Sequence, residues 1–212
     1  YTTSAVIDKG TSEILSKFST LFPYLTLIAY ENNIRDPFST KVVEAYWLGN
    51  NLLNIVRKQK YIHALSEDIG LKKKLNRKNL DTILHNVFSG GLPHHSYHVL
   101  NIFKRTGHLD INQTIETMDA CIINWGKIEK IYSGSLVILT KPLRIIDNKL
   151  ALDKPIKRKI IAPGENDLSF NKLKVGDWVS YHWGYFCQRL NSFQLQNLAY
   201  YTNISIRSAN NN

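Results

Sequence analysis

The chain has 212 residues, of which 43% are hydrophobic and 21% charged, the composition of an ordinary packed globular protein. Its 27 Lys and Arg outnumber its 17 Asp and Glu, so the formal charge is +10. No apolar run approaches the roughly 20 residues that span a bilayer, and two cysteines are too few for a disulfide framework. Membrane-spanning and disulfide-stapled classes are therefore excluded.

The two cysteines, Cys121 and Cys187, also bear on the compartment. Unpaired thiols suit a reducing cytosol, and no secretory signal is recognisable, so we expect a cytoplasmic protein without a membrane segment. Because the cysteines do not form a Cys-x-x-Cys pair, a finger-type zinc site is not expected. The chain opens on Tyr1 instead of Met, which is compatible with a missing or trimmed N-terminal piece.

Apolar residues at helical spacing dominate the first ~115 residues. Pro23 is expected to break or kink the first helix, and Ser39 or Thr40 and then Asn76 are candidate N-caps. Ser89-Gly90-Gly91 is a typical C-terminal stop. The pattern predicts helices over residues 11–22 and 24–31, from the cap at 39 or 40 to 56, from 76 to the stop at 89, over 95–103 and, more weakly, over 111–118.

The pattern changes near Cys121 to short runs of β-branched and aliphatic residues, which are typical of strands. Ser133-Gly134 and Asp147-Asn148 are predicted turns, and Ser192 is expected to cap a final helix. Strands are predicted on either side of the first turn, over 149–152, over 157–161 and over 178–183.

Helices and strands that are segregated along the chain indicate an α+β fold. We predict a helical N-terminal domain over residues 1–118. A small OB-like β-barrel with a closing C-terminal helix follows over 119–207, and the polar tail 208–212 is expected to be frayed.

Two segments of the barrel region carry the most specific motif. The first is Cys-x-x-x-x-Gly-Lys-Ile from Cys121 to Ile128, and the second is Gly-Asp-Trp-Val-x-x-His-x-Gly-Tyr from Gly176 to Tyr185. Together they resemble hydrogenase maturation chaperones of the HypC/HupF type, over roughly residues 121–198. Those chaperones are small OB-like barrels. Their cysteine and histidine are implicated in carrying an iron centre with cyanide and carbon monoxide, assisted by a partner scaffold protein.

The resemblance implies that Cys121 and His182 would hold iron, and that a protein partner of a maturation or assembly complex would dock beside them. The residues around the two ligands that we take as partner-binding are Trp125, Gly126, Asp177 and Trp183. The chain departs from the chaperone pattern in three respects. Cys121 is internal and not N-terminal, Trp125 stands where proline is usual, and the stretch 142–174 is longer.

The whole chain is also similar to a poorly characterised bacterial protein family. The shared segments are Val-Glu-Ala-Tyr-Trp-Leu-Gly-Asn at 43–50, Pro-His-His-Ser-Tyr-His at 93–98 and Gly-Asp-Trp-Val at 176–179. This similarity covers more of the chain than the chaperone motif does, but it implies an architecture and no activity.

A second candidate metal site consists of His94, His95 and His98. If this segment is helical, His94 and His98 lie on one face at i,i+4, a workable spacing for two metal ligands. Glu44, in an apolar helix, could support these histidines from behind, although it could equally lie on an exposed helix edge. The alternative for the histidines is one packed in the core, one at a turn and one in solvent.

Three functions remain open. The leading hypothesis is a non-enzymatic metal-handling or assembly factor. The second is a nucleic-acid-binding module, since lysine clusters and aromatic residues on an OB-like barrel can bind single strands. The third is a metalloenzyme with an inter-domain histidine site. A hydrolase or kinase is disfavoured because no phosphate-binding glycine loop, Gly-x-Ser-x-Gly elbow or His-Glu-x-x-His helix occurs.

Overall fold

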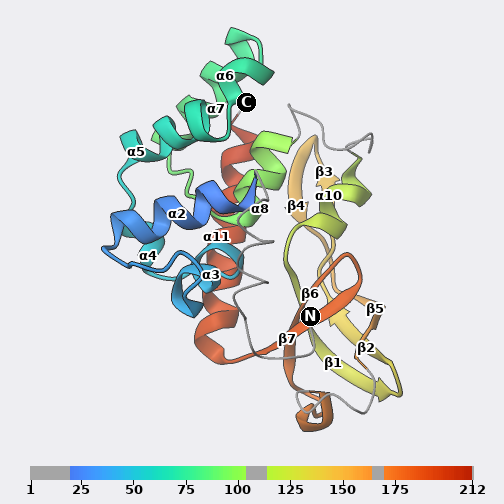
Figure 1. Cartoon of the computed structure of the whole chain (residues 1–212). Helices are drawn as coiled ribbons and strands as arrows, with labels where there is room; N and C mark the ends of the chain where they lie inside the picture. Colours follow the sequence, from blue (N-terminus) through green and yellow to red (C-terminus); the bar gives the residue numbers. More distant parts are fainter. Residues whose placement is uncertain (1–19, 104–113, 164–169, 212) are drawn as a thin grey trace. The chain divides into compact units, whose positions relative to one another are not determined.

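The computed structural model describes residues 20–103, 114–163 and 170–211. Their contacts divide them into two compact units, each described by itself below. A helical unit contains residues 20–103 and 197–211, and a barrel unit contains the described residues of 112–196. The fold is a mixed α+β fold, as predicted, with helices first, then a closed β-barrel and a C-terminal helix (Figure 1). No helix among the described residues is long and apolar enough to cross a membrane.

The helical unit consists of short helices joined by tight turns (Figure 1). In chain order they are α2 (Leu21–Glu31), α3 (Thr40–Trp47), α4 (Leu52–Ile55), α5 (Lys58–His63), the π-helix η1 (Ala64–Asp68), α6 (Leu71–Lys74), α7 (Arg77–Phe88), α8 (His95–Tyr97) and the π-helix η2 (His98–Phe103). The C-terminal part of α11 (Ser192–Asn210) completes the unit.

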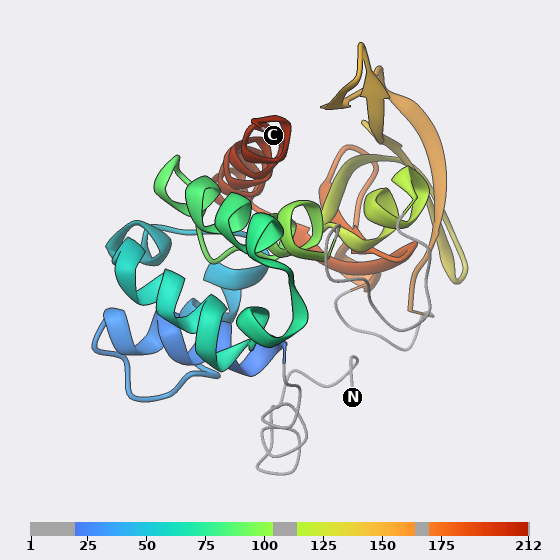
Figure 2. The same ribbon diagram turned by 90° about the horizontal axis from the view of Figure 1, so that it is seen from above.

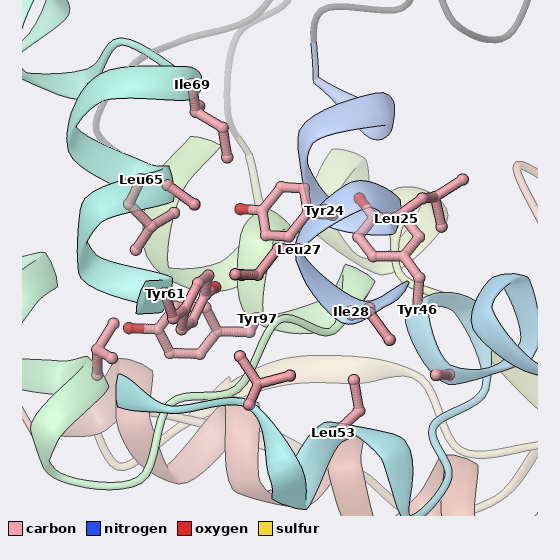
Figure 3. Close-up of a cluster of buried hydrophobic side chains, with 14 of the residues drawn as sticks. Tyr24, Leu25, Leu27, Ile28, Tyr46, Leu53, Tyr61, Leu65, Ile69 and Tyr97 are labelled. Carbon is pink, nitrogen blue, oxygen red and sulfur yellow. The ribbon is translucent and has the colours of Figure 1, made fainter. Parts of the chain in front are cut away.

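Three buried tyrosines lie at the centre of the helical core (Figure 3). Tyr61 is packed between Tyr24 and Tyr97, with ring centroids 6.1 Å and 6.0 Å away. Leu25 and Leu53 belong to the same cluster (Figure 3). Buried aromatic side chains bring a large apolar area into a core and still carry a polar group. One of them bonds to the backbone of a helix, since the Tyr97 hydroxyl donates to the carbonyl of Ile83 in α7 at 3.3 Å.

Several predicted helix boundaries are confirmed. Asn76 caps α7 by accepting a hydrogen bond from the N–H of Asn79 at 2.9 Å, and the helix ends just before Ser89. Ser39 occupies the N-terminal cap position of α3, but its side chain makes no capping hydrogen bond. The predicted helix 11–22 lies mostly outside the described residues. Pro23 does not break α2, because it sits in the first turn, where a missing N–H costs no helical hydrogen bond.

Two differences from the prediction have local causes. The helix that was predicted to reach Val56 ends at Trp47, and Gly49 follows with φ +85°. A Cβ at Gly49 would overlap the ring of Tyr201, which packs directly on this turn. The helices α5, η1 and α6 were not predicted, because exposed lysines interrupt their short apolar stripe.

The barrel unit contains the closed sheet, in the order β1-β2-β5-β7-β6 with β6 returning to β1 (Figures 1 and 2). The strands are β1 (Asn124–Tyr132), β2 (Ser135–Thr140), β5 (Ile156–Ile161), β6 (Trp178–His182) and β7 (Tyr185–Leu190). Neighbours are antiparallel except β5 and β7, which pair in parallel through Ile161 and Tyr185. This five-stranded Greek-key order is that of an OB barrel, as predicted.

A separate hairpin interrupts the barrel between β2 and β5. It consists of β3 (Leu143–Ile146) and β4 (Lys149–Leu152) and projects from the barrel strands as the gold pair in Figure 2. The turn at Asp147-Asn148 is confirmed, with both residues at positive φ, the geometry of a type I′ hairpin. This hairpin accounts for much of the extra length between 142 and 174.

The last strand and helix differ from the prediction. β7 was not predicted, because most of its side chains are exposed and show no apolar alternation. Asn191, and not Ser192, caps α11, since Asn191 and Gln194 exchange backbone-to-side-chain hydrogen bonds of 2.9 and 3.1 Å. The expected frayed tail is helical as far as Asn210, with Ser208 and Ala209 buried. By its contacts, α11 from residue 197 onward belongs to the helical unit and not to the barrel.

Candidate metal site

Cys121 is the last residue of helix α10 (Ile115–Cys121), and strand β1 begins three residues later at Asn124. The helix begins with a capping box in which Thr114 and Thr117 bond to each other's backbone N–H. It ends where the side chain of Asn124, the first residue of β1, donates to the carbonyl of Asp119. The thiol is therefore presented at the C-terminal end of a short helix that leads directly into the barrel.

The β6–β7 hairpin positions His182 against this helix end. Its two-residue turn consists of Trp183 and Gly184, at φ +51° and +78°. A bulky side chain at positive φ is strained and persists only where the surroundings enforce it. Here the N–H of Trp183 donates to the carbonyl of Ala120 at 2.8 Å, which joins the hairpin tip to the last turn of α10. The strained backbone of Trp183 therefore lies where the hairpin tip is bonded to Ala120, the residue that precedes Cys121.

As a result, Cys121 and His182 are neighbours in space although they are distant in sequence. A ring nitrogen of His182 and the Sγ atom of Cys121 lie within 4.8 Å of each other. A metal ion bound at about 2.3 Å from sulfur and 2.1 Å from nitrogen holds such ligands at most about 4.4 Å apart, so both could reach one ion after a small side-chain adjustment. Both residues are half-buried.

Burial determines the protonation states of this pair. It raises the pKa of the Cys121 thiol to about 11, while a hydrogen bond with the Trp183 side chain acts in the opposite direction. Burial also lowers the pKa of His182, and a hydrogen bond with the backbone of Cys121 partly offsets this. At neutral pH the thiol is protonated and the imidazole is neutral. A thiolate–imidazolium pair, as a nucleophilic cysteine requires, is not formed.

Behind Cys121, a buried polar network that sequence reasoning missed connects α10 to the barrel. Asp119 accepts a hydrogen bond from the N–H of Leu143 at 2.7 Å through one carboxylate oxygen, and forms an ion pair with Arg158 at 2.7 Å through the other. Arg158 also donates to the hydroxyl of Tyr181 at 3.1 Å, which shares a hydrogen bond of 3.0 Å with Thr140. Asp119 thus connects α10 directly to β3 and β5, and through Arg158 and Tyr181 to β6 and β2.

One signal in the sequence could have pointed to this network. Asp119 lies in the last turn of a helix, where the helix dipole disfavours a negative charge. A carboxylate in that position calls for a cationic partner, but the lysine-rich strand 157–159 offered several and did not single out Arg158.

The three histidines of residues 94–98 do not gather into a metal site. His94 is extended, at φ −115° and ψ 146°, so the predicted i,i+4 helical pair with His98 is not formed on a helix face. The histidine rings have different neighbours. His94 lies 5.8 Å from the ring of Tyr201, His95 lies 4.4 Å from Trp47, and the Nδ1 of His98 shares a 2.6 Å hydrogen bond with the Tyr24 hydroxyl. In the described part of the chain these three do not form a group of metal ligands with one another.

Their burial indicates a structural role. All three are almost fully buried in the helical unit. Burial lowers the pKa of His94 to about 3, against hydrogen bonds with the backbone of Trp47 and Leu48, so this ring is neutral at physiological pH. The Nδ1 of His94 accepts from the N–H of Ser96 at 3.3 Å, which caps α8. The alternative of a packed core histidine describes His94 and His98 better than the ligand hypothesis, because neither belongs to a group of metal ligands among the described residues.

The remaining predicted residues have local partners. Glu44 is half-buried and accepts a hydrogen bond from the Asn50 side chain at 3.4 Å. Gly126 is buried, and a Cβ there would come within 2.8 Å of Ile138, so packing explains this glycine better than partner contact. Asp177 accepts from the N–H of Lys174 at 2.9 Å in the turn that precedes β6.

Of the predicted partner-binding residues, Trp125, Asp177 and Trp183 retain accessible surface. Trp125 in β1 is half-buried, and its backbone carbonyl accepts a hydrogen bond from Thr140 at 2.6 Å. The Trp183 side chain is 44% exposed. Cys187 is exposed, and its thiol faces the carbonyl of Tyr185 at 3.7 Å. It does not join Cys121 and His182 as a third ligand among the described residues.

The fold and site define a two-unit α+β protein, with a helical unit and an OB-type barrel that carries a cysteine–histidine pair at its edge. The model of a family of unknown function, DUF6390, matches residues 2–212, so the chain belongs to that family. Comparison with curated proteins gives no match, and comparison with solved structures gives none either. The resemblance to hydrogenase maturation chaperones therefore rests on the two short motifs alone.

Proposed function

We propose that the barrel unit binds a transition metal through Cys121 and His182, and that the protein is a non-enzymatic metal-handling or assembly factor. The observation that carries this proposal is the approach of the two ligand atoms within 4.8 Å. A thiolate and an imidazole together suit iron or zinc. The same two positions match the chaperone motif, which favours iron as cargo and a maturation complex as the setting.

The state of the ligands favours transfer over storage. Structural metal sites use four protein ligands, and the two that the barrel unit supplies leave coordination positions open for further ligands of the metal. The neutral imidazole of His182 is ready to bind, but the Cys121 thiol must lose its proton first. A site of this kind binds reversibly, as a carrier must.

Cobalt(II) provides a direct test, because a cobalt–thiolate bond gives a charge-transfer absorption in the near ultraviolet. The full chain should show this band on anoxic titration with cobalt(II), and Cys121→Ser should abolish it. His182→Gln should weaken binding at least tenfold. Cys187→Ser removes the other thiol and should leave the band unchanged. An unchanged band in Cys121→Ser, or no band in the wild type, would refute the proposal.

The identity of the cargo needs a separate measurement. Protein purified under anoxic conditions from its native cells should contain iron and show infrared bands of cyanide and carbon monoxide. Iron that persists at the same level in a Cys121→Ser, His182→Gln double variant would contradict the assignment of these ligands.

A further inference from the structure

The outward face of β1, β2 and β5 carries a second feature that the metal pair does not use. Side chains alternate between the two faces of a strand, and directly paired residues share a face. Leu136, Ile138 and Ile160 point into the barrel core. Their strand neighbours therefore point outward, in rows that the strand register defines.

Two of these rows are basic. Lys127, Leu139 and Lys157 form one row across the three strands, and Lys130, Val137 and Lys159 form the next. All four lysines are exposed, and the aliphatic residues between them are half-buried. The two rows lie two residues apart on β2 and β5, which is roughly 7 Å, and three residues apart on β1, where a bulge adds one residue. The face thus presents two pairs of cations on either side of an apolar strip.

The charge on this face is largely uncompensated. Glu129 reaches Lys157 at 3.0 Å. The other three lysines form no ion pair with any described carboxylate. Lysines along a sheet surface attract an anionic polymer, and neighbouring strands hold them in fixed register.

The next row on the same face has a tyrosine at each end. It runs from Tyr132 through Ser135 and Ile161 to Tyr185. The three large side chains of this row are 49%, 52% and 57% exposed, although the barrel core is complete without them. The backbone holds them together, because the N–H of Ile161 donates to Gly184 at 2.8 Å, next to Tyr185.

We propose that this lysine–aromatic face, defined as Lys127, Lys130, Lys157, Lys159, Tyr132 and Tyr185, binds single-stranded nucleic acid. The lysines would contact phosphates, and the two tyrosine rings would stack on unpaired bases. An acidic protein segment would use the same cations but would gain little from two exposed tyrosines at the end of the lysine rows. In a duplex the faces of the bases are stacked on one another, so the rings of Tyr132 and Tyr185 could not stack on them.

Two double variants test the two parts of the face, with fluorescence anisotropy of a labelled 12-nucleotide oligo(dT) as the readout and the full chain as the protein. Lys130→Gln with Lys159→Gln should weaken binding and reduce the slope of log affinity against log salt by about 1.4, since each single-strand phosphate contributes about 0.7. Tyr132→Ala with Tyr185→Ala should weaken binding tenfold or more at an unchanged salt slope.

The matched control removes two exposed lysines from the helical unit, Lys73→Gln with Lys78→Gln, and should leave the affinity within about twofold. Equal losses in the control would mean nonspecific attraction by net charge and would overturn the proposal. No effect of the tyrosine pair, together with equal competition by poly-glutamate, would assign the face to an acidic protein instead. Cys121→Ser should bind the oligonucleotide normally, so this result is independent of the metal proposal.

Discussion

Asp119 and Arg158 form a 2.7 Å ion pair that fixes the helix carrying Cys121 to strand β5, and the side chain of Asp119 is 6% exposed. Both carboxylate oxygens of Asp119 have a partner, since the second oxygen accepts a hydrogen bond from the N–H of Leu143. A buried ion pair adds modest net stability when intact, but breaking one side leaves a charge without its partner.

Replacing this carboxylate should therefore be costly. Asp119→Ala leaves the Arg158 cation and the Leu143 N–H without their acceptor, so we expect a loss of about 3 kcal/mol in the free energy of unfolding. Asp119→Asn keeps an acceptor for Leu143 and should cost less. Urea denaturation of the barrel unit measures the free energy of unfolding of both variants.

The matched control is a more exposed ion pair, between Lys157 on the same strand as Arg158 and Glu129 on β1. Glu129→Gln should cost less than about 1 kcal/mol, because solvent screens an exposed pair. Equal costs for Asp119→Ala and Glu129→Gln would show that the buried network does not hold α10 in place.

His94 should make the helical unit sensitive to acid. Its pKa is about 3 in the folded protein, against an ordinary value of 6.5. Between these two pH values His94 is protonated in the unfolded chain but not in the folded chain. The stabilising contribution is complete above pH 6.5 and is lost as the pH falls towards 3, by about 1.4 kcal/mol per pH unit. Urea midpoints from pH 7 to 4 should show this slope.

The comparison variant for acid sensitivity is His94→Gln, which retains polar atoms but does not titrate. It should be less stable than the wild type at pH 7 and show a flatter dependence on pH. Parallel pH profiles of the two proteins would exclude His94 as the source of the acid sensitivity.

Metal affinity should rise with pH. The metal takes the Cys121 thiolate, and the thiol has a pKa of about 11, so the thiolate fraction rises tenfold for each pH unit below that value. Apparent cobalt(II) affinity, measured by competition with a chelator whose own pH dependence is known, should increase about tenfold per unit from pH 7 to 9. A flat profile would mean that the thiol is not a ligand.

Gly49 should be intolerant of any side chain. It lies at φ +85°, and a Cβ would overlap the ring of Tyr201, whose hydroxyl donates to the carbonyl of Asn50 at 2.9 Å. Gly49→Ala combines backbone strain with overpacking and should lose about 3 kcal/mol. Gly70→Ala has a similar φ, +77°, but open space around it, and should lose only about 1 kcal/mol. Thermal unfolding of the two variants separates crowding from strain.

Local patterns in the sequence determined the α+β class, the cap at Asn76, and the turns at Ser133-Gly134 and Asp147-Asn148. Each depends on hydrogen bonds and dihedral preferences within a few residues, which the local sequence specifies. Strand β7 and the lysine-rich helices 58–74 escaped prediction because their apolar faces are short and interrupted by exposed polar residues.

Only the tertiary structure decided which of the candidate side chains meet. The chaperone motif predicted that Cys121 and His182 would be close, and they are. Their approach, however, depends on the strained turn at Trp183 and its bond to Ala120, which connect parts of the chain far apart in sequence. Helical spacing also suggested His94 and His98 as a pair, and core packing directed each ring to a different aromatic neighbour. Spacing along a chain specifies local geometry, whereas long-range packing determines where a side chain points.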